Sequence, residues 1–167
     1  YLYNGSTFNG DLNASAGSLF LWGTTFNGAG KFTKTGASTD FSPGGCTYNG
    51  PAEFIIASAG HLGLAYSGTD LFNNEVRVNS TSTGMISTCY GSGTATLAAG
   101  RTIAVGALGF PGGTLYLRNF TQLGTASQSI MLGDNATMYF KGGSTFNGNT
   151  ASSAGNMYLD GTVFNGT

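Results

Sequence analysis

The six residues GSTFNG at positions 5–10 recur unchanged at positions 143–148. Variants of the same phrase are GTTFNG at 23–28, GCTYNG at 45–50 and GTVFNG at 161–166. A related LFNN lies at 71–74. A phrase that occurs five times within 167 residues indicates a chain built from repeated structural units.

The spacing of the phrase predicts a solenoid. Its aromatic positions are separated by 18 to 24 residues, apart from one interval of 74 residues that divides into three turns. In that interval Leu97 and Phe120 are the expected, altered markers. Turns of this length hold two or three short strands, and such turns bury an apolar face only by stacking on one another. The prediction is an all-β fold, a parallel β-helix of about seven coils of 18–25 residues.

The sequence between the repeated phrases is predicted to form short β-strands. Short runs of apolar, aromatic and β-branched residues, such as SLFLW at 18–22, EFIIA at 53–57 and TMYF at 137–140, are bounded by Gly, Asn, Ser or Pro. No stretch has a sustained helical period. Aromatic residues make up 13% of the chain, which supplies a core and argues against a disordered linker.

The repeated phrase is interpreted as a corner of the coil, where the aromatic ring points inward and the following Asn bonds to its equivalent one coil away. At this bend we expect the Asn to adopt a left-handed backbone conformation, with its side chain in a ladder inside the turn. The final Gly is expected to have a second unusual backbone dihedral. The predicted corner aromatics are Phe8, Phe26, Tyr48, Phe72, Phe146 and Phe164, and the predicted Asn ladder is Asn9, Asn27, Asn49, Asn73, Asn147 and Asn165.

A longer repeat is also present. Residues 5–28 align with residues 143–166 without a gap, and 15 of the 24 positions are identical. The chain is therefore expected to hold one 138-residue unit, about 5–142, and the start of the next at 143–167. No signal-peptide pattern follows Tyr1 and no cap is evident, so we expect a processed or internal segment of a longer tandem array.

The charge of the chain limits its partners. Charged residues make up 8% of the sequence, and six basic against seven acidic side chains give a net charge of −1. Nucleic acid and anionic membranes are therefore not expected as partners. No apolar run approaches the roughly 20 residues of a membrane-spanning helix, so membrane insertion is not expected either.

The sequence predicts neither catalytic residues nor a metal site. The carboxylates are scattered along the chain as Asp11, Asp40, Glu53, Asp70, Glu75, Asp134 and Asp160. The closest set, Asp70 and Glu75 with Arg77, is expected to form a surface ion pair. The single histidine, His61, is expected to be structural, because no metal-ligand spacing or triad partner accompanies it.

Two questions stay open from the sequence. No cofactor is expected, but one calcium ion at an Asp-bearing turn remains an alternative, although the GGxGxDxUx motif is absent. Cys46 and Cys89 lie about two coils apart, beyond disulfide reach in one column. Two buried free thiols are favoured over a bridge between different columns of adjacent coils.

The segments GSTFNGN at 143–149, TLYLRNFTQ at 114–122 and FTKTGAS at 32–38 resemble the tandem units of very large secreted surface proteins of Bacteroidota-type bacteria. The resemblance covers nearly the whole chain. It implies export by the type IX route and a role as an adhesin stalk or cell-surface appendage. It implies no catalytic residues.

The leading functional prediction is a structural and binding module of a long extracellular fibre or adhesin shaft, and not an enzyme. Its expected partners are further units of the same chain, identical chains in a fibre, and cell-surface glycans or proteins. Two alternatives remain. An ice-binding solenoid would use the recurring Thr7, Thr25, Thr47 and Thr145, although Val163 interrupts this row. A polysaccharide-degrading β-helix would need grouped carboxylates.

Overall fold

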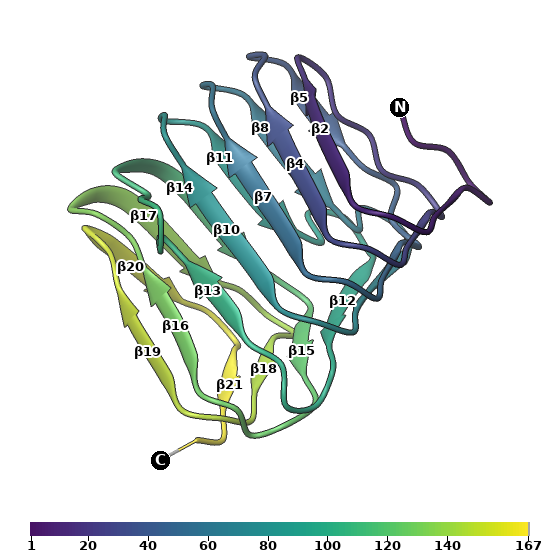
Figure 1. Ribbon diagram of the computed structural model, residues 1–167. Helices are drawn as coiled ribbons and strands as arrows, with labels where there is room; N and C mark the ends of the chain where they lie inside the picture. The colour runs from purple at the N-terminus through teal and green to yellow at the C-terminus, as the bar shows by residue number, and fades with distance from the viewer. Residues whose placement is uncertain (167) are drawn as a thin grey trace.

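The computed structural model describes residues 1–166, which form a parallel β-solenoid made of strands alone (Figure 1). Each turn of the chain contributes one strand to each of three sheets, and all strand pairs are parallel. Six turns contribute to all three sheets, with a partial turn at each end. The predicted all-β solenoid of about seven coils is confirmed.

The three sheets are called sheet 1, sheet 2 and sheet 3 in chain order. Sheet 1 has the order β1 (Thr7–Phe8), β3 (Thr25–Phe26), β6 (Thr47–Tyr48), β9 (Thr69–Phe72), β12 (Thr94–Leu97), β15 (Phe120–Gln122), β18 (Thr145–Phe146) and β21 (Val163–Phe164). Sheet 2 consists of β2 (Leu12–Ala16), β4 (Gly30–Lys34), β7 (Ala52–Ile56), β10 (Val76–Ser80), β13 (Ile103–Val105), β16 (Gln128–Met131) and β19 (Thr150–Ser153). Sheet 3 consists of β5 (Thr39–Phe41), β8 (His61–Leu64), β11 (Met85–Thr88), β14 (Gly112–Leu117), β17 (Asn135–Phe140) and β20 (Asn156–Leu159).

The core contains two columns of aromatic rings that meet inside the solenoid. Phe26 of sheet 1 packs edge-on against Phe32 of sheet 2, with ring centroids 5.1 Å apart and planes at 73°. Phe32 in turn stacks on Phe54, one coil further, at 5.3 Å. All three rings are fully buried. Their edge-to-face and stacked contacts add to the apolar area that they bury.

The first glycine of the repeated phrase lies at the corner between sheet 3 and sheet 1, and its backbone is left-handed. Its φ values are +82° at Gly5, +54° at Gly23, +80° at Gly45, +82° at Gly143 and +65° at Gly161. In the coils that lack this glycine, the left-handed residue is Asn119 at the same register position (φ 48°), and Ala65 (φ 47°) and Cys89 (φ 54°) directly after strands β8 and β11. This corner therefore requires a left-handed residue, for which glycine is the least strained choice.

The last glycine of the phrase has a different role from the one predicted. Neither it nor the preceding Asn has a positive φ, so the expected unusual dihedrals at this corner are wrong. A Cβ added to Gly50 would lie 2.1 Å from the carbonyl oxygen of Gly28 in the coil below. A Cβ added to Gly148 would lie 2.1 Å from the Ala126 carbonyl oxygen. Glycine is needed here because successive backbones pass too close for a side chain.

The clearance at this corner gives a matched pair of variants. We expect Gly50→Ala to lower the free energy of unfolding by about 1–3 kcal/mol, because the clash is with backbone that cannot rotate away. Gly10→Ala, at the equivalent position of the first coil, should change it by less than about 0.5 kcal/mol, since nothing lies within 4 Å of an added Cβ. Urea unfolding of both variants measures the difference. Equal losses would show that clearance between coils does not select this glycine.

Candidate functional site

The predicted corner aromatics share one column of sheet 1. The Cα register aligns Phe8 with Phe26, Phe26 with Tyr48, Tyr48 with Phe72, and Phe146 with Phe164. Their rings stack at centroid distances of 5.6, 5.1, 4.7 and 5.4 Å in the same order. The four inner rings are buried, whereas Phe8 and Phe164 are partly exposed in the end coils. The column therefore forms part of the core and not a ligand-contacting row.

Two coils interrupt this aromatic column. Leu97 occupies the marker position of β12, as expected, but Gln122 and not Phe120 occupies it in β15. Phe120 pairs with Ala95, two residues earlier in the strand, and its buried ring lies 5.5 Å from that of Phe146. The choice of Phe120 as marker was wrong because a ring at a neighbouring inward position fills the same space.

The predicted Asn residues form a ladder in two pieces. Each amide donates to the side-chain oxygen of the Asn one coil back: Asn27 to Asn9 and Asn49 to Asn27 at 2.8 Å, Asn73 to Asn49 at 2.9 Å, and Asn165 to Asn147 at 2.8 Å. Asn147 itself donates to the Gln122 carbonyl at 2.6 Å. Five of the six side chains are exposed, so the ladder lies on the outside of the corner and not inside it.

A column of threonines lies on the outer side of sheet 1. The register aligns Thr7, Thr25, Thr47, Leu71, Thr96, Thr121, Thr145 and Val163. The sequence analysis missed Thr96 and Thr121, because their coils carry no aromatic-Asn-Gly phrase to mark the position. The alternation of side chains along the preceding strands is the signal that could have found them.

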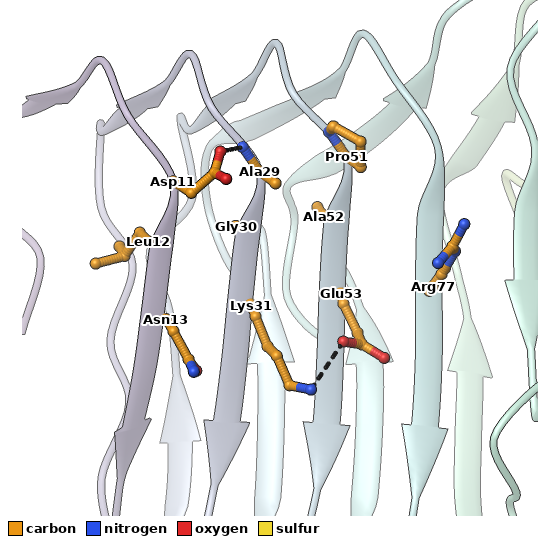
Figure 2. A pocket seen from close by; sticks show the side chains of 10 residues that line it. All are labelled: Asp11, Leu12, Asn13, Ala29, Gly30, Lys31, Pro51, Ala52, Glu53 and Arg77. Carbon is orange, nitrogen blue, oxygen red and sulfur yellow. Dashed lines mark hydrogen bonds and ion pairs between the residues drawn. The ribbon is translucent and has the colours of Figure 1, made fainter.

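The outer side of sheet 2 carries a charged face (Figure 2). Asp11, Lys31, Glu53 and Arg77 line a shallow hollow of about 470 Å³ across strands β2, β4, β7 and β10. Lys31 Nζ lies 3.3 Å from Glu53 Oε2, and Arg77 pairs with Glu75 at 3.1 Å. The Asp11 carboxylate accepts a hydrogen bond from the Ala29 amide at 2.8 Å. Acid and base therefore alternate along this face and largely neutralise each other.

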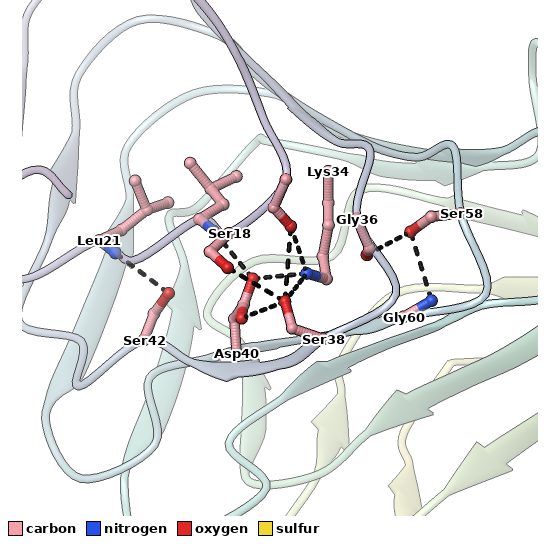
Figure 3. Close-up of polar contacts among 11 residues, drawn as sticks. Ser18, Leu21, Lys34, Gly36, Ser38, Asp40, Ser42, Ser58 and Gly60 are labelled. Atoms are coloured by element: carbon pink, nitrogen blue, oxygen red, sulfur yellow. Dashed lines mark hydrogen bonds and ion pairs between the residues drawn. The ribbon is translucent and has the colours of Figure 1, made fainter.

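A lysine and an aspartate are buried together at the corner between sheets 2 and 3 (Figure 3). Lys34 Nζ lies 2.5 Å from Asp40 Oδ2 and donates to the Gly17 carbonyl at 3.0 Å. Asp40 also accepts hydrogen bonds from the Leu19 amide and the Ser38 hydroxyl. Burial alone would raise the pKa of Asp40, but these donors and the Lys34 charge hold that pKa below its ordinary value. The pair joins three successive stretches of chain and is structural.

A second buried carboxylate, Asp70, lies in the core beside both cysteines. Its Oδ1 accepts the Cys46 amide at 2.9 Å, and its Oδ2 has no partner among the described residues. Burial raises the pKa of Asp70 to about 7. Burial also raises the thiol pKa of Cys46 and of Cys89 to about 12, and both thiols are free. The favoured expectation of two buried thiols matches this arrangement, and their high pKa makes them poor nucleophiles.

The set of Asp70, Glu75 and Arg77 does not come together. Asp70 is fully buried in the core, whereas Glu75 and Arg77 pair on the outer surface, so the expected three-residue surface set was wrong. Within residues 1–166, no group of three or more His, Cys, Asp or Glu side chains is placed to hold a metal ion. The structure therefore offers no acid–base or metal constellation from these candidates.

His61 is hydrogen-bonded on the outer side of sheet 3. Its Nε2 lies 2.8 Å from the Ser87 hydroxyl, and its ring packs nearly perpendicular to the rings of Phe41 and Tyr90. Burial lowers the pKa of His61 to about 4, so the imidazole is neutral at pH 7. Ser87 is fully buried, and a substrate therefore has no route to this hydroxyl.

The buried Asp70 carboxyl makes stability depend on pH. Below about pH 4 it is protonated in both states, and as the pH rises to about 7 only the unfolded chain ionises, so the fold loses stability. His61 acts in the opposite sense, because its contribution is complete above about pH 6.5 and is lost as the pH falls through about 4. The two effects oppose each other in the same interval.

The variant Asp70→Ser separates the pH effect of Asp70 from that of His61. Ser is chosen because Ser144, in a later coil, accepts the Phe120 amide as Asp70 accepts the Cys46 amide. Relative to the unmodified chain, we expect the variant to gain on the order of a few kcal/mol of stability between pH 4 and pH 7. Urea unfolding across this interval measures the gain, with the exposed Asp134→Ser as control. A difference that stays constant with pH would contradict a neutral buried Asp70.

Comparison with protein-family models, with curated proteins and with solved structures finds no match to this chain. Among residues 1–166, no helix has the length and apolar character needed to span a membrane.

Proposed function

We propose that this chain is a structural and binding module of a long extracellular shaft, as in a fibre, an adhesin stalk or a cell-surface appendage that mediates attachment. The observation that carries the proposal is the recurrence of local geometry at an offset of 138 residues. A rigid segment whose two ends repeat the same contacts is suited to continuation by further units of its own kind.

The contacts at the start of the chain return near its end with the same geometry. The recurring contacts are Asn27 with Asn9 and Asn165 with Asn147 (both 2.8 Å), Thr24 with the Tyr3 carbonyl (3.2 Å) and Thr162 with the Lys141 carbonyl (3.1 Å), and the rings of Phe8 with Phe26 (5.6 Å) and of Phe146 with Phe164 (5.4 Å). The contacts between the last two coils thus repeat the contacts between the first two.

The C-terminal coil leaves its upper side open. Phe164 is 41% exposed and Leu159 is 64% exposed, whereas their equivalents Phe26 and Leu21 are buried beneath the next coil. A following coil similar to residues 29–48 would cover these side chains as it covers their equivalents here. Burying them stabilises the continued stack by the usual hydrophobic gain.

The location and assembly state follow from the same proposal. A surface with few charges and many Ser, Thr and Asn residues suits lateral contact between identical chains, and the resemblance to secreted tandem-repeat proteins supports an extracellular site and type IX export. The partners are further units, neighbouring copies and surface molecules of other cells. In an array, six coils at about 4.8 Å would give each unit a rise of about 29 Å.

End-to-end association of the purified chain tests the proposal. At high concentration we expect rods with an axial spacing of about 4.8 Å, observed by electron microscopy and fibre diffraction. Phe164→Asp should lower the association constant at least about tenfold, because it places a charge on the open end. Leu108→Asp, at an equally apolar residue that is 73% exposed on a side loop, is the control. The proposal of a shaft would be refuted if Leu108→Asp weakened association as much as Phe164→Asp does. It would also be refuted if the chain formed only compact particles.

The threonine column on sheet 1 favours a second candidate function, adsorption to ice. Six of its eight positions are Thr, aligned from strand to strand by the backbone register. Hydroxyl and methyl groups repeated at coil spacing present a regular surface to ordered water. If this row binds ice, the chain should show thermal hysteresis. The variant Thr96→Lys should abolish it, whereas the control variant Lys31→Gln, on sheet 2, should leave it unchanged. Absence of hysteresis in the unmodified chain would exclude this function.

A further inference from the structure

A row of tyrosines runs along the outer side of sheet 3. Tyr116 and Tyr139 stack with ring centroids 4.3 Å apart and planes at 4°, and Tyr139 and Tyr158 stack at 4.6 Å and 11°. Because these rings lie face to face, the faces between them are closed to a ligand, which can reach only edges and hydroxyls there.

The stack ends at Tyr116, because Ser87 occupies the next position of this column, and a hollow lies beside that end. Tyr90, three residues after Ser87, stacks on Phe41 with ring centroids 5.4 Å apart. The ring of Tyr90 is perpendicular to that of Tyr116, with planes at 87° and centroids 6.0 Å apart. Tyr90 is 44% exposed. Thr88, Tyr90, Tyr116, Arg118 and Lys141 line a hollow of about 240 Å³ at this point, which is called the Tyr90–Arg118 site.

Two of the six basic side chains of the chain meet at this site. The Arg118 guanidinium donates to the Tyr90 carbonyl at 3.0 Å, and in the described part of the chain no carboxylate forms a salt bridge with it. Lys141 Nζ lies 3.4 Å from Asp160 Oδ2, in a solvent-exposed pair that contributes little. The site therefore presents one positioned and uncompensated cation beside a second, weakly paired one.

The backbone of Arg118 is held in place from below. The Thr88 hydroxyl donates to the Arg118 carbonyl and accepts the Arg118 amide, both at 3.1 Å, and Thr88 is itself buried. Together with the bond to the Tyr90 carbonyl, these contacts fix the guanidinium relative to the tyrosine rings. Less conformational freedom is then lost when an anion binds.

We propose that the Tyr90–Arg118 site binds a carboxylate-bearing sugar, such as a uronic acid or sialic acid unit of a glycan. Guanidinium matches a carboxylate with two parallel hydrogen bonds, and exposed tyrosine supplies both an apolar ring and a hydroxyl to a sugar. A hollow smaller than typical pockets of about 300–1,000 Å³ suits one sugar ring. The proposal names a ligand class for this surface and does not depend on the chain being a shaft.

The charged face of sheet 2 is less suited to bind a carboxylate-bearing sugar. Its hollow is larger, but Lys31 and Arg77 are each paired with a glutamate there. An incoming carboxylate would have to displace an existing one and would meet the neighbouring acidic charges. Arg77 therefore provides a matched control cation on another side of the same molecule.

Calorimetric titration of the full chain tests the proposal with three sugars: oligogalacturonate, N-acetylneuraminic acid and a neutral galacto-oligosaccharide. At low salt we expect at least one acidic sugar to bind at least about tenfold more tightly than the neutral one. The stronger of the two acidic ligands identifies the source of the carboxylate. Equal binding of acidic and neutral sugars, or no binding of either acidic sugar, would overturn the proposal.

Variants locate the binding on the molecule. Arg118→Gln should weaken binding at least about tenfold, and Asp160→Asn should strengthen it about twofold by freeing Lys141. Arg77→Gln and Asp134→Asn should leave the affinity unchanged, with circular dichroism and the unfolding midpoint as checks of folding. An equal loss with Arg77→Gln, or inorganic sulfate binding as tightly as the acidic sugar, would reduce the effect to general charge attraction and refute the site.

Discussion

Hydrogen bonds between successive coils determine the rest of this structure, because they hold each residue directly over its equivalent one turn away. In sheet 2, Phe32 lies over Ala14 and beneath Phe54, and the same backbone register aligns Lys31 with Glu53. Side chains are thus sorted into columns, and every column must satisfy its own neighbours. Rings stack on rings, amides bond to amides, and opposite charges alternate where charge occurs.

The same constraint explains the two kinds of glycine in the repeated phrase. One glycine turns the chain in a left-handed conformation, and the other makes room for the coil beside it. Both positions are glycine in the sequence. The residue type alone does not distinguish a requirement for a left-handed dihedral from a requirement for space. The repeat therefore predicted the solenoid and the position of its corner, but it misassigned the reason for the final glycine.

Polar residues inside the solenoid were the main features that the sequence analysis missed. The alternation along GKFTK at 30–34 places Lys34 on the same side as Phe32, so a signal for its burial was present. Its partner Asp40 lies across a bend, and no sequence spacing reports that contact. Asp70 was predicted to join a surface ion pair because Glu75 and Arg77 follow closely. The alternation of exposed and buried residues along β9 instead places its side chain on the inward side, with that of Phe72. Tyr90 and Arg118 lie 28 residues apart and meet only because two coils stack.

The coil-to-coil ladders also determine how the molecule responds to force. Their hydrogen bonds point along the axis on which the coils stack, and Figure 1 shows the first and last coils at opposite ends of the stack. Tension applied through these ends acts on the bonds of one terminal coil at a time, so the coils peel in sequence instead of shearing together. A released coil of about 24 residues can extend to roughly 80 Å, against about 4.8 Å when stacked. Such a chain lengthens many-fold under load while its remaining coils stay folded, and it thereby dissipates mechanical work.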